Sequence, residues 1–151
     1  MQFVRNTAAC LLCIMVYSYK GEARTARHKR SFRQLEYQLD YHFGEDRATA
    51  LLDYGCYCGK SGKSHPLDGV DQCCKDHDDC YDREHDCLPK TLDYRFYLGN
   101  KTVNCEDGPN SCEGRVCKCD KTFVDCLQNK EFNPIYNNVD QHKYCSDKKS
   151  C

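Results

Sequence analysis

Apolar residues recur with a helical period in the region that follows residue 30. Phe32, Leu35 and Leu39 are separated by three and four positions. Because an α-helix turns once every 3.6 residues, this spacing places the three side chains on one face. The pattern predicts an amphipathic first helix, in which the residues between the apolar positions are polar: Arg33, Gln34, Glu36 and Gln38.

Two longer segments favour helices, and one favours a hairpin. No glycine or proline interrupts the stretch after residue 69, so we expect a helix over about 69–84. Gly114 precedes a third predicted helix, over about 115–130, which ends near a proline at position 134. Between them, residues 91–103 are rich in aromatic and β-branched residues, which favours a short hairpin. The tail from residue 135 onward has no regular pattern.

The apolar residues are too few for an ordinary hydrophobic core. Leu, Ile, Val and Phe together account for 26 of the 151 residues, whereas 15 residues are cysteine. So many cysteines in a chain of single-domain length indicate a disulfide-stapled domain of the secretory route. The composition weighs against a cytosolic enzyme, a coiled coil and a repeat array. The formal net charge of −1 weighs against a nucleic-acid binder, and no apolar run reaches the roughly 18 residues that cross a bilayer.

The amino end has the layout of a secretory signal peptide over residues 1–20. Arg5 is followed by an apolar stretch from residue 8 to 17 and then by small and polar residues. The basic cluster at 27–30 resembles a proprotein-convertase site, so we predict a propeptide over 21–30; a solvated charge run is the alternative. The remaining domain, 31–151, has 16 Lys and Arg against 22 Asp and Glu, which gives a net charge of −6.

One predicted helix carries a histidine between two cysteines. Cys73, His77 and Cys80 share a helical stripe, because residues three and four apart face the same way. Cys119 and Cys126 repeat the seven-residue spacing on the third predicted helix. Two disulfides could therefore join these helices, which carries the histidine inward. The spacing is compatible with antiparallel and with parallel helices, and it does not choose between them.

Acidic residues accompany this histidine. Asp120 follows Cys119 and so lies near the helix that bears His77. An imidazole beside a carboxylate suits a general base, although such pairs are more often structural. Asp78 points about 100° away from His77 on the same helix. Its carboxylate, with backbone carbonyls of the glycine-rich loop at 54–62, offers the oxygen ligands that calcium prefers.

Two motifs resemble those of the secreted phospholipase A2 family. Residues 54–59 read Tyr-Gly-Cys-Tyr-Cys-Gly, and residues 71–81 read Asp-x-Cys-Cys-x-x-His-Asp-x-Cys-Tyr. The later Cys-x-Cys-Asp at 117–120 also fits, and the resemblance covers roughly residues 31–145. It implies a mainly α, disulfide-stapled small domain. The domain would contain two long antiparallel helices, an amphipathic N-terminal helix, a calcium loop and a short β-hairpin.

The resemblance implies calcium-dependent hydrolysis of the sn-2 ester of a glycerophospholipid, giving a free fatty acid and a lysophospholipid. His77 would be the general base that takes a proton from the attacking water, and Asp120 would orient its imidazole. Tyr81 and Tyr94 would hydrogen-bond to Asp120; plain core aromatics are the alternative for these two tyrosines. Ca2+ would be the cofactor.

The calcium ligands follow from the same resemblance. They would be the carboxylate of Asp78 and the backbone carbonyls of Tyr57, Gly59 and Ser61, and the N–H of Gly59 would complete the oxyanion site. Ser61 stands where the family usually has glycine, so a left-handed backbone there would be strained. We expect calcium binding to survive in a weakened form. A zinc site is disfavoured, because oxidised cysteines cannot donate thiolates.

The resemblance also implies a disulfide pairing that requires antiparallel helices. It leaves Cys151 over, for which a disulfide-linked dimer, a small-thiol adduct and a free thiol are all open. The implied pairs are Cys56–Cys145, Cys58–Cys74, Cys73–Cys126, Cys80–Cys119, Cys87–Cys112 and Cys105–Cys117.

The family meets its substrate at lipid surfaces, so phospholipid membranes or micelles are the expected partners. Phe32 and Leu35 are the candidates for the wall of a substrate channel, with Leu39 deeper; an ordinary core stripe is the alternative. The charge of −6 favours zwitterionic over anionic lipid. A catalytically silent relative that acts as a binding or toxin-type protein is the second hypothesis. A disulfide-rich growth factor is a third, but it does not explain the histidine and its two acids.

Overall fold

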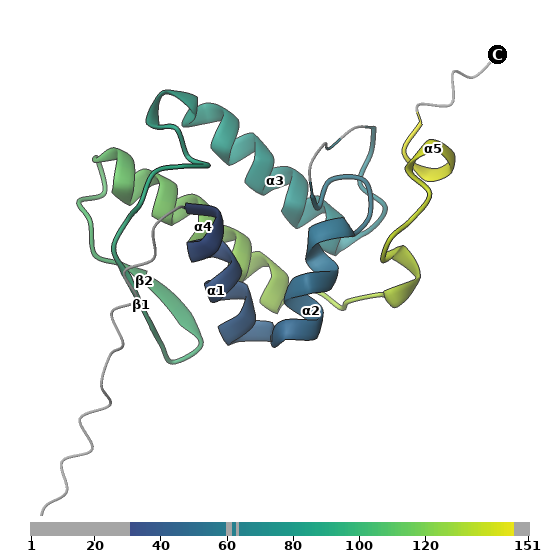
Figure 1. Cartoon of the computed structure of the whole chain (residues 1–151), viewed down its shortest axis with the longest axis horizontal. Helices are drawn as coiled ribbons and strands as arrows, with labels where there is room; N and C mark the ends of the chain where they lie inside the picture. Colours follow the sequence, from purple (N-terminus) through teal and green to yellow (C-terminus); the bar gives the residue numbers. More distant parts are fainter. Residues whose placement is uncertain (1–30, 60–61, 63, 147–151) are drawn as a thin grey trace, which may run out of the picture.

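The structure is a computed structural model that describes residues 31–59, 62 and 64–146, with side chains from residue 33 onward. The described part is mainly helical, with a two-stranded sheet and six disulfides (Figure 1), which confirms the predicted fold class. The predicted signal peptide and propeptide lie outside the described residues. So do Ser61, Cys151 and the side chain of Phe32.

Two long helices, α3 (Gly69–Arg83) and α4 (Cys112–Gln128), form the centre of the molecule. The disulfide Cys73–Cys126 joins the early part of α3 to the end of α4, and Cys80–Cys119 joins the later part of α3 to the middle of α4. This pairing requires the two helices to run antiparallel, and Figure 1 shows them side by side. The structure therefore decides the choice that the seven-residue spacing left open.

The start of α4 differs from the prediction. The helix begins three residues before Arg115, because the hydroxyl of Ser111 accepts a hydrogen bond from the N–H of Gly114 and caps the first turn. Gly114 thus lies inside the helix. A Cβ at that position would stand 2.0 Å from the carbonyl oxygen of Gly108, so only glycine permits this close approach.

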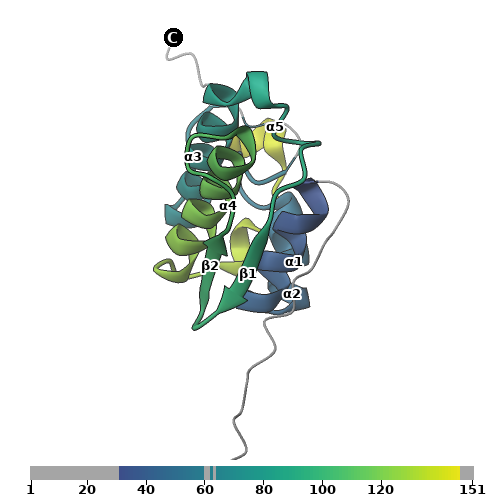
Figure 2. The same ribbon diagram turned by 90° about the vertical axis from the view of Figure 1, so that its left-hand side faces the viewer.

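The first helix, α1 (Ser31–Phe43), forms as predicted and is longer than the apolar stripe. Gly44, with φ at 80°, ends it and redirects the chain into two short elements that the sequence did not reveal. These are α2 (Glu45–Ala50) and the 3-10 turn η1 (Leu51–Asp53). Figures 1 and 2 show α1 and α2 beside the helix pair.

The buried face of α1 includes more residues than the predicted apolar stripe. Leu35 and Leu39 are buried, as expected for the apolar stripe. Gln34 and Gln38, which the amphipathic pattern counted as polar separators, are only 1% and 0% exposed. Both glutamines make hydrogen bonds to Tyr94. These partners come from a segment 56 to 60 residues away, so local periodicity could not reveal them.

The hairpin consists of β1 (Phe96–Gly99) and β2 (Thr102–Cys105), paired antiparallel with Phe96 opposite Cys105. It lies a few residues later than predicted. The disulfide Cys105–Cys117 ties it to α4, and Figure 2 shows it beside α1 and α4. The 3-10 turn η2 (His85–Cys87) follows α3. The tail is less irregular than expected, since it contains the turn η3 (Pro134–Tyr136) and the short helix α5 (Gln141–Tyr144).

The cross-links supply much of what the small apolar core lacks. All six disulfides join the pairs that the resemblance implies. Half-cystines and aromatic rings make up a large part of the buried cluster, together with valine and leucine side chains. Each disulfide restricts the unfolded chain and stabilises the fold by about 2–4 kcal/mol. Among the residues with a described conformation, no helix is long and apolar enough to cross a membrane.

Candidate active site

The cross-linked helices bring a histidine and an aspartate together. Nε2 of His77 on α3 lies 2.8 Å from Oδ1 of Asp120 on α4. Asp120 is fully buried, and the His77 side chain is 9% exposed. When Nε2 carries the proton that this carboxylate accepts, Nδ1 is the basic ring nitrogen. No described residue forms a hydrogen bond to Nδ1, so it is available as a proton acceptor.

Two aromatic rings confine the His77 imidazole. Tyr81 lies on one side, with ring centroids 4.2 Å apart. The Phe123 ring stacks on the imidazole at 4.7 Å, with an interplanar angle of 27°. Phe123 is on the same turn of α4 as Asp120, and it was not predicted to belong to the site. Its sequence position, three residues after Asp120, is the signal that could have found it.

The two tyrosines implied by the resemblance both donate to Asp120. The Tyr81 hydroxyl is 2.6 Å from Oδ1, and the Tyr94 hydroxyl donates to Oδ2. Burial, followed by the Asp120 charge, raises the pKa of Tyr94 well above its usual value, so the phenol keeps its proton and remains a donor. With His77, the buried carboxylate therefore has three hydrogen-bond donors, which offset the cost of burying its charge.

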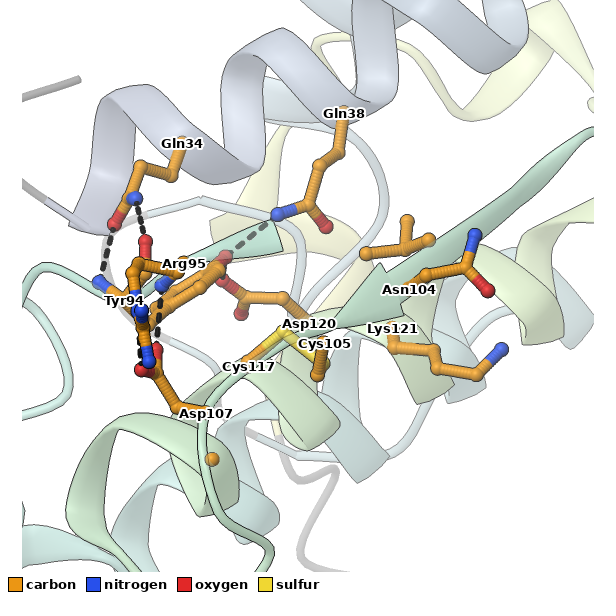
Figure 3. Close-up of a disulfide and its surroundings, with 12 residues drawn as sticks. Gln34, Gln38, Tyr94, Arg95, Asn104, Cys105, Asp107, Cys117, Asp120 and Lys121 are labelled. Carbon is orange, nitrogen blue, oxygen red and sulfur yellow. Dashed lines mark hydrogen bonds and ion pairs between the residues drawn. A yellow bond between two sulfur atoms is a disulfide. The ribbon is translucent and has the colours of Figure 1, made fainter. Parts of the chain in front are cut away.

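The helix α1 reaches the same network through glutamines that the sequence did not reveal. Figure 3 shows Gln34 and Gln38 pointing from α1 toward Tyr94, with Asp120 beyond the phenol. Nε2 of Gln38 donates to the Tyr94 hydroxyl oxygen at 2.6 Å. The network therefore extends over three elements: α1, the segment before β1, and the helix pair.

The loop that precedes α3 is anchored by a buried carboxylate. Asp71, which is fully buried, accepts hydrogen bonds from the backbone N–H groups of Cys56, Tyr57 and Leu67 at 2.7–2.8 Å. Gly55 packs directly against this carboxylate, since a Cβ there would lie 2.3 Å from its carbon. The motif that contains Asp71 was recognised, but its structural role was not predicted.

Two glycines show how the loop is packed and where it approaches Asp78. Gly59 has φ at 129°, and a Cβ there would stand 2.6 Å from the Leu52 carbonyl oxygen, so this turn requires glycine. Gly62 lies against the Tyr57 ring, and a Cβ on it would be 3.1 Å from Oδ2 of Asp78. At Gly62 the loop therefore comes close to the Asp78 carboxylate.

The prediction for Ser61 stays untested, and a serine three residues later has a left-handed backbone. Ser61 lies outside the described residues, whereas Ser64 adopts a left-handed conformation with φ at 79°. The Tyr57 hydroxyl donates to the Ser64 carbonyl at 2.5 Å and holds that turn. A residue other than glycine with a left-handed backbone conformation destabilises the fold by about 1–3 kcal/mol, which the surrounding contacts must offset.

Asp78 places a carboxylate beside the loop, and a carboxylate is a hard oxygen donor of the kind that calcium prefers. In the part of the chain that the structure covers, no three His, Cys, Asp or Glu side chains gather as a metal site. Twelve half-cystines are in disulfides and cannot donate thiolates, so a cation site at this loop would rest on the Asp78 carboxylate and backbone carbonyls. Burial raises the pKa of Asp78, which disfavours its charge when no cation compensates it.

A cavity of about 450 Å³ lies along the helix pair, with His77, Phe123, Arg83 and Lys118 among the residues that line it. Leu35, Leu39, Tyr57 and Asp78 do not line it. The cavity therefore touches the imidazole but is not the predicted substrate channel. The assignment of Phe32 and Leu35 to a channel wall stays a prediction.

Comparison with known proteins agrees with the family resemblance of the sequence. The family model described as Phospholipase A2 matches residues 32–137. The chain is 41% identical over 95 residues to the basic phospholipase A2 beta-bungarotoxin A-AL4 chain of Bungarus multicinctus, covering 61% of this chain and 69% of that protein. The A5 chain of the same species is 40% identical over 96 residues (62% and 70%). The A1 chain of Bungarus candidus is 38% identical over 96 residues (62% and 70%).

Proposed function

The chain belongs to the phospholipase A2 family, and on that premise we propose that it is a secreted, calcium-dependent phospholipase A2. It would hydrolyse the sn-2 ester of glycerophospholipids to a free fatty acid and a lysophospholipid. The observation that carries the proposal is the 2.8 Å contact between His77 Nε2 and the buried Asp120. This contact leaves Nδ1 as the basic nitrogen of a confined imidazole.

His77 would act as general base and then as general acid. Nδ1 accepts a proton from the water that attacks the ester carbonyl, and the imidazolium then returns that proton to the departing glycerol oxygen. Asp120 stabilises the imidazolium and holds the tautomer, as a buried carboxylate does for a catalytic histidine. Because Tyr81 and Tyr94 also donate to Asp120, the carboxylate keeps its orientation while the ring gains and loses its proton.

The loop would supply the cation site. Asp78 and the carbonyls of Tyr57, Gly59 and Ser61 would hold a calcium ion, and the close approach of Gly62 to Asp78 supports this ligand set. When bound, calcium would attract the substrate phosphate and polarise the ester carbonyl. The Gly59 N–H would donate to the developing oxyanion.

The charge of the domain supports a preference for zwitterionic lipid surfaces. Residues 31–151 have a net charge of −6, whereas the three relatives are named basic phospholipases. An acidic domain gains no general attraction to anionic leaflets, which recruit clustered Lys and Arg. Phospholipid membranes or micelles would be the partners. Secretion is supported by the predicted signal peptide and by the six disulfides, which persist in oxidising compartments.

The test is fatty-acid release from phosphatidylcholine vesicles labelled at the sn-2 acyl chain. We expect release with calcium, none with chelator, and loss of at least about 10³-fold in His77→Gln. An equivalent sn-1 label is the positional control and should stay in the lysophospholipid. Wild-type protein that is folded, binds calcium and releases no fatty acid would contradict the proposal.

The rival hypothesis, a catalytically silent binding or toxin-type protein, gives that last outcome. The names of the relatives contain both phospholipase A2, which agrees with an enzyme, and bungarotoxin, which agrees with a toxin-type protein. In this chain His77, Asp78 and Asp120 are all present. The proposal of an active enzyme rests on these three residues and their geometry.

A further inference from the structure

Two glutamines on α1 meet Tyr94 in different ways. Gln34 clamps the backbone of Tyr94: its Nε2 donates to the Tyr94 carbonyl at 2.6 Å, and its Oε1 accepts from the Tyr94 N–H at 3.2 Å. Both bonds resemble the pairing of a neighbouring strand, so Gln34 holds the segment in place. Gln38, one turn later, contacts the phenol instead (Figure 3).

The contact to the phenol fixes the direction of the hydrogen bonds. Tyr94 has one hydroxyl proton, and Nε2 of Gln38 donates to its oxygen at 2.6 Å. The hydroxyl proton therefore points to Oδ2 of Asp120. The result is a chain of donors from Gln38 through Tyr94 to the carboxylate, which the His77 imidazole meets from the other side.

We propose that Gln38 is a positioning residue for the His77–Asp120 pair. By donating to the Tyr94 hydroxyl, it commits the phenol proton to Asp120 and links the first helix to the catalytic carboxylate. This role rests on the proposed function, and it acts through Tyr94 without contact with the reacting atoms.

Fold stability does not account for a glutamine at this position. Gln38 is completely buried, and its Oε1 accepts no hydrogen bond from any residue that the structure describes. An unsatisfied buried acceptor is unfavourable, whereas an apolar side chain of similar length would fill the space without this penalty. A methionine would thus serve the core at least as well, which separates a positioning role from a structural one.

The test compares Gln38→Met with a matched control, Gln72→Met. Gln72 is an exposed glutamine on α3 that donates to the Asp76 carboxylate, away from the network. In Gln38→Met we expect kcat to fall about fivefold, the effect of losing one neutral hydrogen bond. KM, the calcium half-saturation and the melting temperature should be unchanged, or the melting temperature slightly higher. Gln72→Met should keep the wild-type kcat. Gln38→Leu serves as a second variant if Gln38→Met does not fold.

A double-mutant cycle with Tyr94→Phe then locates the effect. Once the phenol is gone, Gln38→Met should have no further effect on kcat, because the two residues act through one hydrogen bond. An effect of the same size in both backgrounds would overturn the proposal. So would a fall in kcat that follows a fall in melting temperature, since that is the behaviour of a structural residue.

A spectroscopic measurement keeps the inference independent of activity. The buried Tyr94 hydroxyl proton should give a slowly exchanging low-field NMR resonance that disappears in Tyr94→Phe. Gln38→Met should shift it, and Gln72→Met should not; an unmoved resonance in Gln38→Met overturns the proposal. If the wild-type protein hydrolyses nothing, the proposed function fails, while this arm still reports whether Gln38 sets the direction of the network.

Discussion

The helix pair and the loop at 54–62 hold their proposed functional groups in different ways. In the helix pair, side chains would do the chemistry: two disulfides set the register of α3 against α4, and His77 and Asp120 meet at 2.8 Å. In the loop, backbone carbonyls are the proposed ligands. The loop is held by one buried carboxylate, Asp71, and by the disulfides Cys56–Cys145 and Cys58–Cys74.

This difference separates two kinds of dependence on sequence. A side-chain site survives as long as the residue and the helix register are kept, because a helix fixes the direction of each side chain. A backbone site depends on the conformation of residues whose side chains take no part, such as the left-handed Ser64. The helix pair should therefore fail by loss of a functional group, and the loop by loss of shape.

The largest effect is expected in the helix pair, from His77→Gln. Glutamine keeps a polar side chain of similar size but supplies no base, so hydrolysis should fall by at least about 10³-fold with the fold intact. Hydrolysis rates with circular dichroism on the same sample measure both. Activity within tenfold of wild type would show that another group is the base.

A smaller but still large effect is expected in the loop, from Asp71→Asn. The amide can accept at one oxygen only, and its NH₂ would face backbone donors. We expect a loss of about 2–4 kcal/mol in the free energy of unfolding and a higher calcium requirement. Denaturant unfolding and a calcium titration measure the two effects. An unchanged calcium requirement would mean that Asp71 does not shape the loop.

Removing one disulfide from each region sharpens the comparison. Cys73→Ala with Cys126→Ala leaves the Cys80–Cys119 bond in the helix pair, so stability should fall by about 2–4 kcal/mol while the calcium half-saturation stays the same. Cys56→Ala with Cys145→Ala should lower stability and also raise the calcium requirement. Thermal unfolding and calcium titrations distinguish the two variants. If both variants had the same melting temperature and the same calcium half-saturation, the proposed difference between the two regions would be wrong.

The smallest effect is a pH dependence at the end of α1, where the first helix rests on the helix pair. Burial lowers the pKa of His42 from 6.5, and Asp125 opposes this shift. Below pH 6.5 the unfolded chain takes up a proton that the folded state resists, so stability is lost as the pH falls. Because His42 is partly exposed, the loss should be less than about 1 kcal/mol. Melting temperatures of wild type and His42→Gln should converge above neutral pH and separate below it.

The sequence predicts the helix pair better than its surroundings. The seven-residue cysteine spacing predicts that the two helices are cross-linked, and the family resemblance adds the pairing, which requires antiparallel helices, and Tyr94. Gln34, Gln38 and Phe123 were missed as parts of the site, because their roles depend on partners far along the chain or on another helix. Periodicity reports which residues share a face, and it does not report what that face meets.

The loop was predicted less well, for a related reason. The glycines predict an unusual backbone conformation, but they do not predict which residues of the loop adopt the left-handed conformation. Gly55 and Ser64 both do so, and Asp71 holds the loop through three backbone N–H groups. Hydrogen bonds to the backbone leave no mark on the identity of the residues that donate them. The loop depends most on its backbone conformation, and this conformation is the hardest feature to predict from the amino-acid sequence.

One calcium titration of sn-2 ester hydrolysis, run on wild type, Asp71→Asn and His77→Gln, tests the division between the two regions most directly. We predict that Asp71→Asn needs more calcium but approaches the wild-type rate at saturation, and that His77→Gln stays inactive at every concentration. A plateau for Asp71→Asn far below wild type, or recovery of His77→Gln at high calcium, would contradict the account.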